Sequence, residues 1–196
     1  MIGIIKYQAG NLASVSNALE RLGPKYFISD DPDKLEKADA IIFPGVGHAA
    51  AAMDDLRSKD LDVWLVETKK PVLGICLGMQ LLYESSEEGN SETLGIIPGR
   101  LKKFDSSLAK VPHMGWNKFK PEKAHPIING IGNEQFLYYV HGYYAPKNEY
   151  TLATCHYIQD FAAIVAKDNF IGVQFHPEKS GLVGSLLLQN FLHMVK

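Results

Sequence analysis

Short apolar runs alternate with helix-like patterns along the first half of the chain. Four apolar residues recur at the spacing of one helix face and are followed by Gly23-Pro24, which would end the helix: Leu12, Val15, Leu19 and Leu22. The same reasoning predicts strands at 3–5, 26–28, 40–43 and 72–75, and helices at 12–22, 49–57, 61–68 and 78–85. Strands that alternate with helices are typical of a parallel sheet covered on both faces.

Beyond residue 95 the pattern changes to short β-rich runs separated by turn residues. The runs at 136–140, 152–157, 162–166 and 171–175 are predicted antiparallel strands beside the parallel core. Ser180 is placed to cap a last helix. Its apolar side is expected to carry Leu182, Leu186, Leu187, Phe191 and Leu192. The segments 89–91 and 121–123 are predicted surface loops.

The expected fold class is therefore α/β, with a mostly parallel central sheet flanked by helices and an added antiparallel β region. A length of 196 residues favours a single domain over residues 1–196. The composition, 46% hydrophobic and 21% charged, excludes disordered and fibrous classes.

Charge and cysteine content limit the kinds of partner and the cellular compartment that we expect for this protein. The chain has 20 basic and 22 acidic residues, net −2, so it lacks the basic excess typical of nucleic-acid binding. Two cysteines, Cys76 and Cys155, argue against a disulfide scaffold and favour a reducing compartment. The N-terminal apolar run is too short for a signal peptide, and no uncharged stretch reaches the ~20 residues of a membrane helix. We therefore expect a cytoplasmic protein that does not enter a membrane.

The predicted strand at 72–75 runs into Gly74-Ile75-Cys76-Leu77-Gly78, which has the spacing of a nucleophile elbow with cysteine in place of serine. Such a sharp strand-to-helix turn needs small neighbours and pushes its central side chain out of the sheet. Cys76 would lie at a helix N-terminus, where the helix dipole favours a thiolate. The Leu77 N–H would point at an oxyanion formed on a substrate.

A second interpretation of Cys76 is a small buried residue between two incidental glycines, because free cysteine is among the most buried residue types. The five-residue pattern by itself does not decide between the two. Cys155 has no such context. It lies in a β-rich run beside His156, on the opposite face of the strand, and is interpreted as structural.

A nucleophilic cysteine needs a base, and His176 stands out among seven histidines because it follows the predicted strand 171–175. Pro177 disfavours a helical His176. Residues i and i+2 of an extended segment point the same way, so Glu178 is expected to orient the imidazole. Cys76, His176 and Glu178 would then form a triad.

The remaining histidines fall into two groups. Three are interpreted as lone structural side chains with satisfied hydrogen bonds: His125, His156 and His193. Each of the other three adjoins a glycine- or proline-containing turn, and the sequence does not decide whether that turn faces the site around Cys76. Their role stays open: His48, His113 and His141.

Pro44-Gly45-Val46-Gly47 follows the third predicted strand and forms a loop able to turn its N–H groups inward. A phosphate-binding turn and a plain tight βα loop are the alternatives. The Lys-Ser/Thr ending of a Walker loop is missing, and no Gly-x-Gly-x-x-Gly follows the first strand. No His/Cys spacing indicates a metal site. We expect neither cofactor nor metal.

Three motifs, in this order, resemble class I (triad-type) glutamine amidotransferases: residues 44–47, 74–80 and 174–180. Two further stretches, 111–117 and 139–144, are similar to one branch of that family, the glutaminase subunits of imidazole glycerol phosphate synthase. The resemblance covers nearly the whole chain, from Gly10-Asn11 to the last helix.

The resemblance implies a mechanism and a partner. Cys76 would attack the side-chain amide of glutamine, His176 would pass a proton to the departing ammonia, and Glu178 would orient His176. The second oxyanion donor would come from Val46 or Gly47. Glutamine would be held by Gly45, Gly47, Gln80, Glu88, Gly142 and Tyr143. Ammonia would pass to a (β/α)8-barrel cyclase subunit in a heterodimer. Residues expected toward that partner are Asn11, Trp116, Tyr138 and Lys179.

Two positions depart from that branch. It often has Asp-Tyr-Gly where this chain has Lys6-Tyr7-Gln8, and Ser or Thr where this chain has Gly142, so only a backbone contact to glutamine is expected there. Two alternatives stay open. One is an amidotransferase subunit that feeds a paralogous barrel, for example in sugar-nucleotide modification. The other is a non-catalytic regulatory subunit on the same fold, which an intact triad disfavours.

Overall fold

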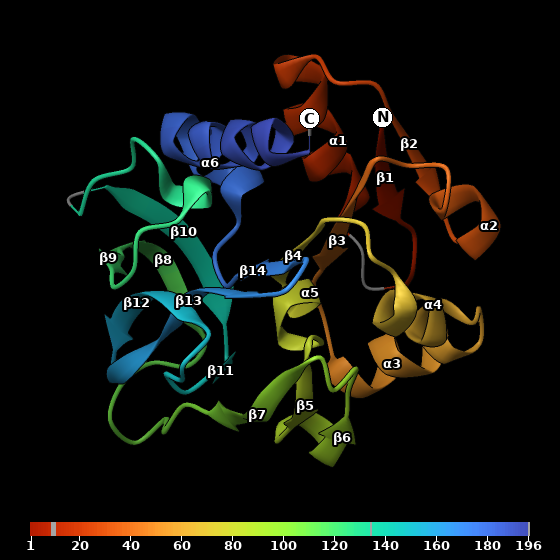
Figure 1. Ribbon diagram of the computed structural model, residues 1–196. Helices are drawn as coiled ribbons and strands as arrows, with labels where there is room; N and C mark the ends of the chain where they lie inside the picture. The colour runs from red at the N-terminus through yellow and green to blue at the C-terminus, as the bar shows by residue number, and fades with distance from the viewer. Residues whose placement is uncertain (9–10, 134, 196) are drawn as a thin grey trace.

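An eight-stranded sheet forms the centre of the protein in a computed structural model that describes residues 1–8, 11–133 and 135–195 (Figure 1). Gly10, part of the family resemblance, lies outside the described residues. The strand order is β2-β1-β3-β4-β14-β13-β12-β9. Their bounds are Tyr26–Ser29, Ile2–Ile5, Ala40–Gly45, Val72–Cys76, Phe170–Val173, Gln159–Lys167, Thr151–Tyr157 and Lys120–Pro121. The first five run parallel and the last three antiparallel to their neighbours.

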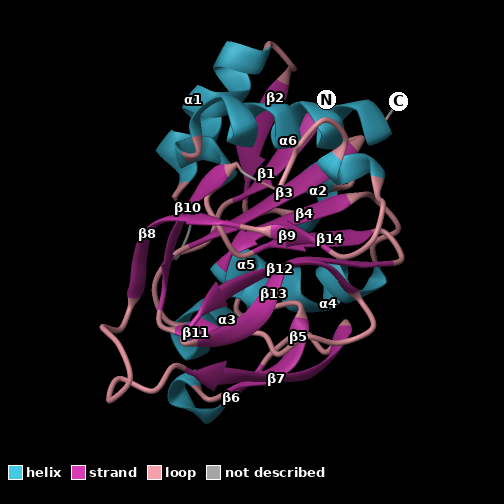
Figure 2. Ribbon diagram, turned by 90° about the vertical axis from the view of Figure 1, so that its left-hand side faces the viewer, coloured by secondary structure: helices cyan, strands magenta, loops and turns pink. Residues whose placement is uncertain are grey.

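Helices cover the two faces of the parallel half (Figures 1 and 2). On one face lie α1 (Leu12–Leu22) and α6 (Gly181–Met194), and on the other α3 (Ala49–Arg57) and α4 (Leu61–Glu67). The short helix α2 (Pro32–Leu35) adds Leu35 to the second face. Strand β1 shows how the sequence serves both cores: Ile4 packs on the first side and Ile5 on the second, because successive strand residues point to opposite faces.

Two smaller sheets adjoin the antiparallel half. One pairs β8 (His113–Lys118) with β10 (Phe136–His141), and the other has the order β11-β7-β5-β6 (Tyr143–Tyr144, Ile97–Lys103, Tyr83–Ser86 and Ser91–Glu92). The described part of the chain also contains three 3-10 turns: η1 (Glu88–Asn90), η2 (Pro126–Ile128) and η3 (Pro177–Lys179). The α/β class with an added antiparallel region, predicted from the sequence, is confirmed.

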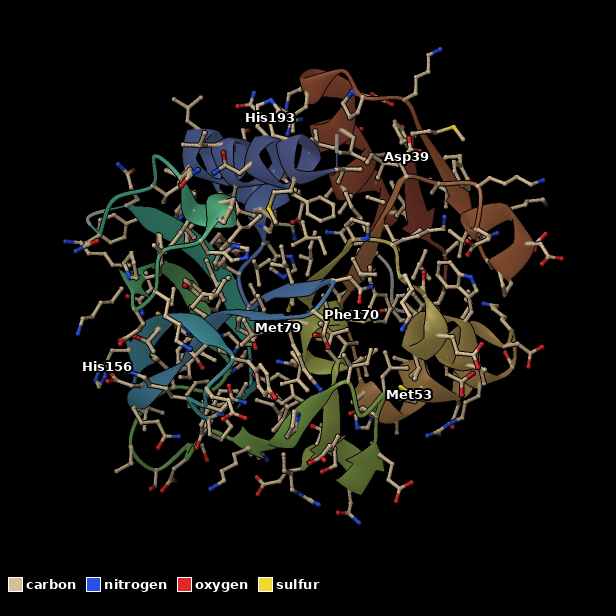
Figure 3. The ribbon with its side chains drawn as sticks, viewed as in Figure 1. Asp39, Met53, Met79, His156, Phe170 and His193 are labelled. Carbon is tan, nitrogen blue, oxygen red and sulfur yellow. The ribbon has the colours of Figure 1, made fainter. Side chains whose placement is uncertain are left out.

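Local signals placed several elements correctly. Helix α1 begins at Leu12, buries Val15 and Leu19, and ends at Gly23, whose φ of +82° is a left-handed conformation that glycine adopts readily. Helix α3 covers the predicted residues 49–57. Cys155 is buried and the His156 side chain is exposed at the surface of the protein, as the alternation of strand β12 predicted. In Figure 3, His156 lies at the edge of the molecule and the buried Met79 lies in its interior.

Four predictions were wrong, each because a partner distant in sequence decides the conformation. The predicted helix 78–85 is one turn of α5 (Leu77–Gln80), and residues 83–86 form β5, which pairs with β7 and buries Tyr83. Strand β14 is parallel to β4, with Ile171 opposite Leu73, and is not part of the antiparallel addition. The predicted surface loops at 89–91 and 121–123 are largely present, since only Ser91, which starts β6, and Pro121, which ends β9, lie in strands.

The other two concern the last helix. Leu182 is 90% exposed, so it does not belong to the buried side of α6, although Leu187 and Phe191 do. Ser180 occupies the N-cap position but makes no side-chain cap. Its hydroxyl instead donates to the His176 carbonyl (2.6 Å) and accepts from the Tyr138 N–H (3.0 Å). That hydroxyl therefore ties the loop after β14 to β10.

Gly78 allows α5 to lie directly against β3. A Cβ at this position would overlap with the carbonyl oxygen of Phe43 and lie 2.9 Å from its carbon. Gly78→Ala is expected to lower the free energy of unfolding by about 3 kcal/mol, at the upper end of overpacking costs, because main chain on both sides must move. Gly132→Ala is the matched control, since the space around Gly132 is open among the described residues. Urea unfolding checks the pair, and equal stabilities would contradict this close approach.

Candidate active site

Cys76 lies where β4 ends and α5 begins, at the carboxyl edge of the parallel sheet. Its backbone has φ 53° and ψ −108°, a strained conformation for a residue with a Cβ, and its side chain is only 6% exposed. The sharp elbow predicted from the Gly-x-Cys-x-Gly spacing is therefore present. Leu77 is the first residue of α5, so its N–H has no acceptor within the helix and is available at the elbow.

His176 and Glu178 form a buried pair beside the elbow. His176 Nδ1 lies 2.8 Å from Glu178 Oε1, and the two side chains are 3% and 1% exposed. The predicted pairing is thus present, although the reason given for it was wrong. Residues 177–179 form the 3-10 turn η3 and are not extended, so the turn brings Glu178 back toward the ring. The His176 N–H also donates to the Tyr138 carbonyl at 2.8 Å, which anchors the backbone.

The surroundings of His176 favour its charged form. Burial alone would lower the pKa of His176, but hydrogen bonds and charges from Cys76 and Glu178 outweigh burial and raise that pKa to about 10. Glu178 Oε2 is buried without a hydrogen-bond partner among the described residues, so the imidazolium is the main counter-charge of this carboxylate. Because Nδ1 is held by Glu178, Nε2 is the ring atom left to exchange a proton with Cys76.

A cavity of about 280 Å³ opens above Cys76 and His176. Eight of the other sequence-predicted site residues line it: Val46, Gly47, Leu77, Gln80, Glu88, Gly142, Tyr143 and Lys179. Pro112, Val140 and His141 complete the lining. A larger groove of about 730 Å³ lies between the ends of α1 and α6, but it contains neither cysteine nor a histidine–carboxylate pair. Chemistry, not volume, therefore selects the cavity above Cys76.

The loop after β3 reaches the cavity because Gly45 is the register partner of Cys76 in the β3–β4 pair. Gly47 has a φ of +104°, which favours glycine, and it is exposed together with Val46. Gly45 itself is buried inside β3 and does not line the cavity. A Cβ there would lie 2.7 Å from the Gly78 nitrogen, so the absence of a side chain at Gly45 lets β3 lie against the elbow. A contact between Gly45 and glutamine stays a prediction.

Polar side chains that line the cavity are fixed by hydrogen bonds to neighbouring residues. The Glu88 carboxylate accepts from the Ala49 N–H at 2.7 Å, at the start of α3. The Gln80 amide nitrogen donates to the Tyr143 carbonyl at 3.0 Å and to Gln174 Oε1 at 2.9 Å. Because both amide hydrogens of Gln80 are committed, its Oε1 is the atom that remains for a ligand.

His113 and His141, whose role the sequence left open, form a neutral buried pair behind the cavity. Burial lowers the pKa of His113 to about 4 and that of His141 to about 3. His141 Nδ1 donates to the Tyr143 carbonyl (2.8 Å), and its Nε2 accepts from His113 Nδ1 (3.1 Å). Asn117 Nδ2 lies 3.3 Å from His113 Nε2. The pair therefore fixes the Gly142–Tyr143 wall through the same Tyr143 carbonyl that accepts from Gln80.

The residues predicted to face a partner lie near one another beside the cavity. Trp116 on β8 is the register partner of Tyr138 on β10, with ring centroids 5.8 Å apart. Lys179 is exposed at the cavity rim in η3, against which α1, preceded by Asn11, packs. Met114, Trp116 and Phe136 are exposed apolar side chains of the β8–β10 pair.

The sequence interpretation missed one residue of the site. Gln174 is fully buried, and its Nε2 lies 3.7 Å from Cys76 Sγ. Its position two residues before His176 is a signal only once β14 is known to lie beside β4, because that neighbour brings Gln174 under the elbow.

Two absences hold for the described part of the chain. No group of three or more His, Cys, Asp or Glu residues there is arranged to hold a metal ion. Among the same residues, no helix combines the length and the apolar character needed to span a bilayer.

A parallel sheet that carries a cysteine at a strand-to-helix elbow, beside a buried His–Glu pair, defines the class of cysteine-dependent acyl-transfer enzymes. The match to a family model is consistent with this class: the glutamine amidotransferase class-I model matches residues 7–195. The chain belongs to the class-I glutamine amidotransferase family.

Known relatives agree. The chain is 46% identical over 195 residues to the imidazole glycerol phosphate synthase subunit HisH of Bacteroides fragilis, covering 98% of this chain and 99% of that one. It is 44% identical to the subunit of the same name of Shewanella loihica, over 97% of this chain and 89% of the relative. A solved glutamine amidotransferase matches with a TM-score of 0.77 at 18% identity, over 99% and 98% of the two chains, which supports the fold.

Proposed function

We propose that this chain is the glutaminase subunit of an imidazole glycerol phosphate synthase. It hydrolyses glutamine to glutamate and ammonia and delivers the ammonia to a (β/α)8-barrel cyclase subunit for histidine biosynthesis. The observation that carries the proposal is the Cys76–His176–Glu178 arrangement, of which Cys76 and His176 line the cavity. Full-length relatives at 42–46% identity, all carrying that subunit name, supply the pathway.

The chemistry follows from the geometry. Cys76 Sγ attacks the side-chain carbonyl carbon of glutamine and forms a tetrahedral oxyanion. The Leu77 N–H and a second N–H at Val46 or Gly47 hold that oxyanion. Collapse of this intermediate breaks the C–N bond, and His176 Nε2–H protonates the leaving nitrogen, which departs as ammonia and leaves a thioester on Cys76.

Water completes the cycle. The now neutral His176 removes a proton from a water molecule, which attacks the thioester carbonyl. Collapse of the second tetrahedral intermediate breaks the C–S bond, which releases glutamate and the Cys76 thiolate. His176 is then protonated again. Glu178 takes no proton: it holds Nδ1 of His176 and stabilises the charged ring.

The cavity wall offers complementary groups to an amino acid. The Glu88 carboxylate and Gln80 Oε1 are acceptors suited to the α-ammonium group. The backbone of Gly142 and Tyr143 also lines the cavity, and Gln80 and His141 both donate hydrogen bonds to the Tyr143 carbonyl. Gly142 carries no side chain, so its contact with glutamine runs through the main chain. Gly47 contributes at the loop after β3.

The partner surface we propose includes the exposed apolar side chains of Met114, Trp116 and Phe136. Such a patch, next to the rim residue Lys179, marks an interaction site more often than a solvated surface. Asn11 and Tyr138 extend the same surface. A single domain in the cytoplasm is part of the proposal, supported by two free cysteines, Cys76 and Cys155.

The test is a coupled assay with a histidine-pathway cyclase and its ribulosyl aminoimidazole-carboxamide nucleotide. The wild-type pair is expected to make imidazole glycerol phosphate from glutamine. A pair carrying Cys76→Ser is expected to do so only from ammonium salts at alkaline pH. If only a barrel subunit of sugar-nucleotide modification activates the chain, the chain belongs to that pathway instead. If no barrel subunit produces glutamate release, the chain is a non-catalytic subunit.

A further inference from the structure

We propose that the side-chain amide of Gln174 is a catalytic hydrogen-bond donor to the sulfur of Cys76. In this role it stabilises the thiolate from the side opposite the cavity. The proposal rests on the proposed function, because it takes Cys76 as the nucleophile. Gln174 Nε2 lies 3.7 Å from Cys76 Sγ, and the Gln174 side chain is fully buried.

The orientation of the Gln174 amide follows from a chain of obligatory donors and acceptors. The Tyr143 carbonyl can only accept, so the Gln80 atom 3.0 Å from it must be the amide nitrogen. The same nitrogen lies 2.9 Å from the Gln174 side chain, which must therefore present its oxygen. The nitrogen of Gln174 is then left to face Cys76. One backbone carbonyl thus determines which end of a buried amide meets the sulfur.

Two hydrogen bonds at the Cys76 sulfur, those with Val140 and Gln174, have opposite effects on its ionisation. The Val140 carbonyl, 3.6 Å from Sγ, accepts a hydrogen bond from the thiol and offers nothing to a thiolate. The Gln174 N–H stabilises the thiolate more than the thiol, since hydrogen bonds to a charged acceptor are the stronger ones. Together with the charge on His176, Gln174 therefore shifts the balance toward the reactive form.

Gln174 is also well supported. Its backbone N–H donates to the Ala163 carbonyl at 2.9 Å, which holds the residue against β13 just beyond the end of β14. With both backbone and side chain fixed, the amide needs no rearrangement when charge develops on the sulfur. A donor that is already aligned is the condition under which such a hydrogen bond assists a reaction.

The experiment follows alkylation of Cys76 by iodoacetamide across pH, read by mass spectrometry on the labelled peptide. Gln174→Met keeps the length and removes the donor. In this variant the pH midpoint of alkylation is expected to rise by about 1–2 pH units, with about 10–100-fold slower labelling at pH 7. The plateau rate at high pH stays unchanged, because the thiolate itself is still accessible. Gln159→Met, at an exposed position of β13, is the control and leaves the profile unaltered.

Cys155 reports on folding in the same sample. It is buried, and burial raises the pKa of its thiol to about 12, so it is labelled only if the variant unfolds. An unchanged Cys76 profile with Cys155 protected would overturn the proposal. This readout uses no glutamine. Failure of the proposed function would show separately, as glutamine hydrolysis that survives Cys76→Ser.

A second measurement, on the wild-type protein, tests the proposal even if the Gln174→Met variant does not fold. In the wild-type protein, the side-chain NH2 signals of Gln174 in a ¹⁵N NMR spectrum are expected to move with pH. Their midpoint should equal the Cys76 alkylation midpoint. In Cys76→Ser the same signals stay constant over that range. Gln174 NH2 signals that do not change as Cys76 ionises in the wild-type protein would refute the hydrogen bond between Gln174 and Cys76.

Discussion

Serine in place of Cys76 is expected to lower glutamine hydrolysis by about 10³-fold or more while the chain stays folded. A serine hydroxyl fits the elbow, with its φ of 53°, as well as the thiol does. It does not ionise beside His176, however, so the attacking group is lost while the cavity is kept. Glutamate release, measured with the cyclase partner present, checks the loss.

Cys155→Ala is the matched control for this prediction. Cys155 is equally buried but lies on β12, within the hydrophobic core. The substitution is expected to cost some stability through the lost sulfur contacts and to leave turnover close to the wild-type value. Comparable losses of turnover at the two positions, or labelling of Cys155 by a glutamine-like electrophile in the folded chain, would remove the assignment of Cys76.

The isolated chain is expected to be a poor glutaminase, about 10²–10³-fold slower than the chain docked to the proposed cyclase partner with nucleotide bound. The elbow supplies one oxyanion donor, the Leu77 N–H, and loss of a second donor costs a factor of this size. That second donor must come from the loop after β3. The partner would activate the chain by favouring the loop state in which the N–H faces the cavity.

The structure locates the freedom of that loop. Gly45 is held inside β3 against α5, whereas Gly47 is exposed and no described residue lies within 4 Å of where its Cβ would be. The peptide between Val46 and Gly47 is therefore the one able to turn. Glutamate release is measured for the chain alone, with cyclase, and with cyclase plus nucleotide. Equal turnover in the three mixtures would mean that the oxyanion donors are already in place without a partner.

Local signals in the sequence determined the parts of this protein whose conformation depends on neighbouring residues. The apolar spacing from Leu12 to Leu22, with Gly23 beyond it, specifies α1 because side chains three and four apart share a helix face. The Gly-x-Cys-x-Gly spacing specifies the elbow at Cys76, because only small neighbours permit so sharp a turn. The position of His176 and Glu178 after a predicted strand was enough to find the pair, even though a 3-10 turn holds them together.

Tertiary structure alone decided the rest. Residues 83–86 form a strand because β7 and β6 supply hydrogen-bond partners, which outweigh a helical pattern in the sequence. Leu182 is exposed because α6 presents another side to the sheet. His113 joins His141, and Gln174 meets Cys76, through contacts that span 28 and 98 residues. No local pattern encodes such contacts, because each depends on which strands become neighbours, and that choice is made by the packing of the whole sheet.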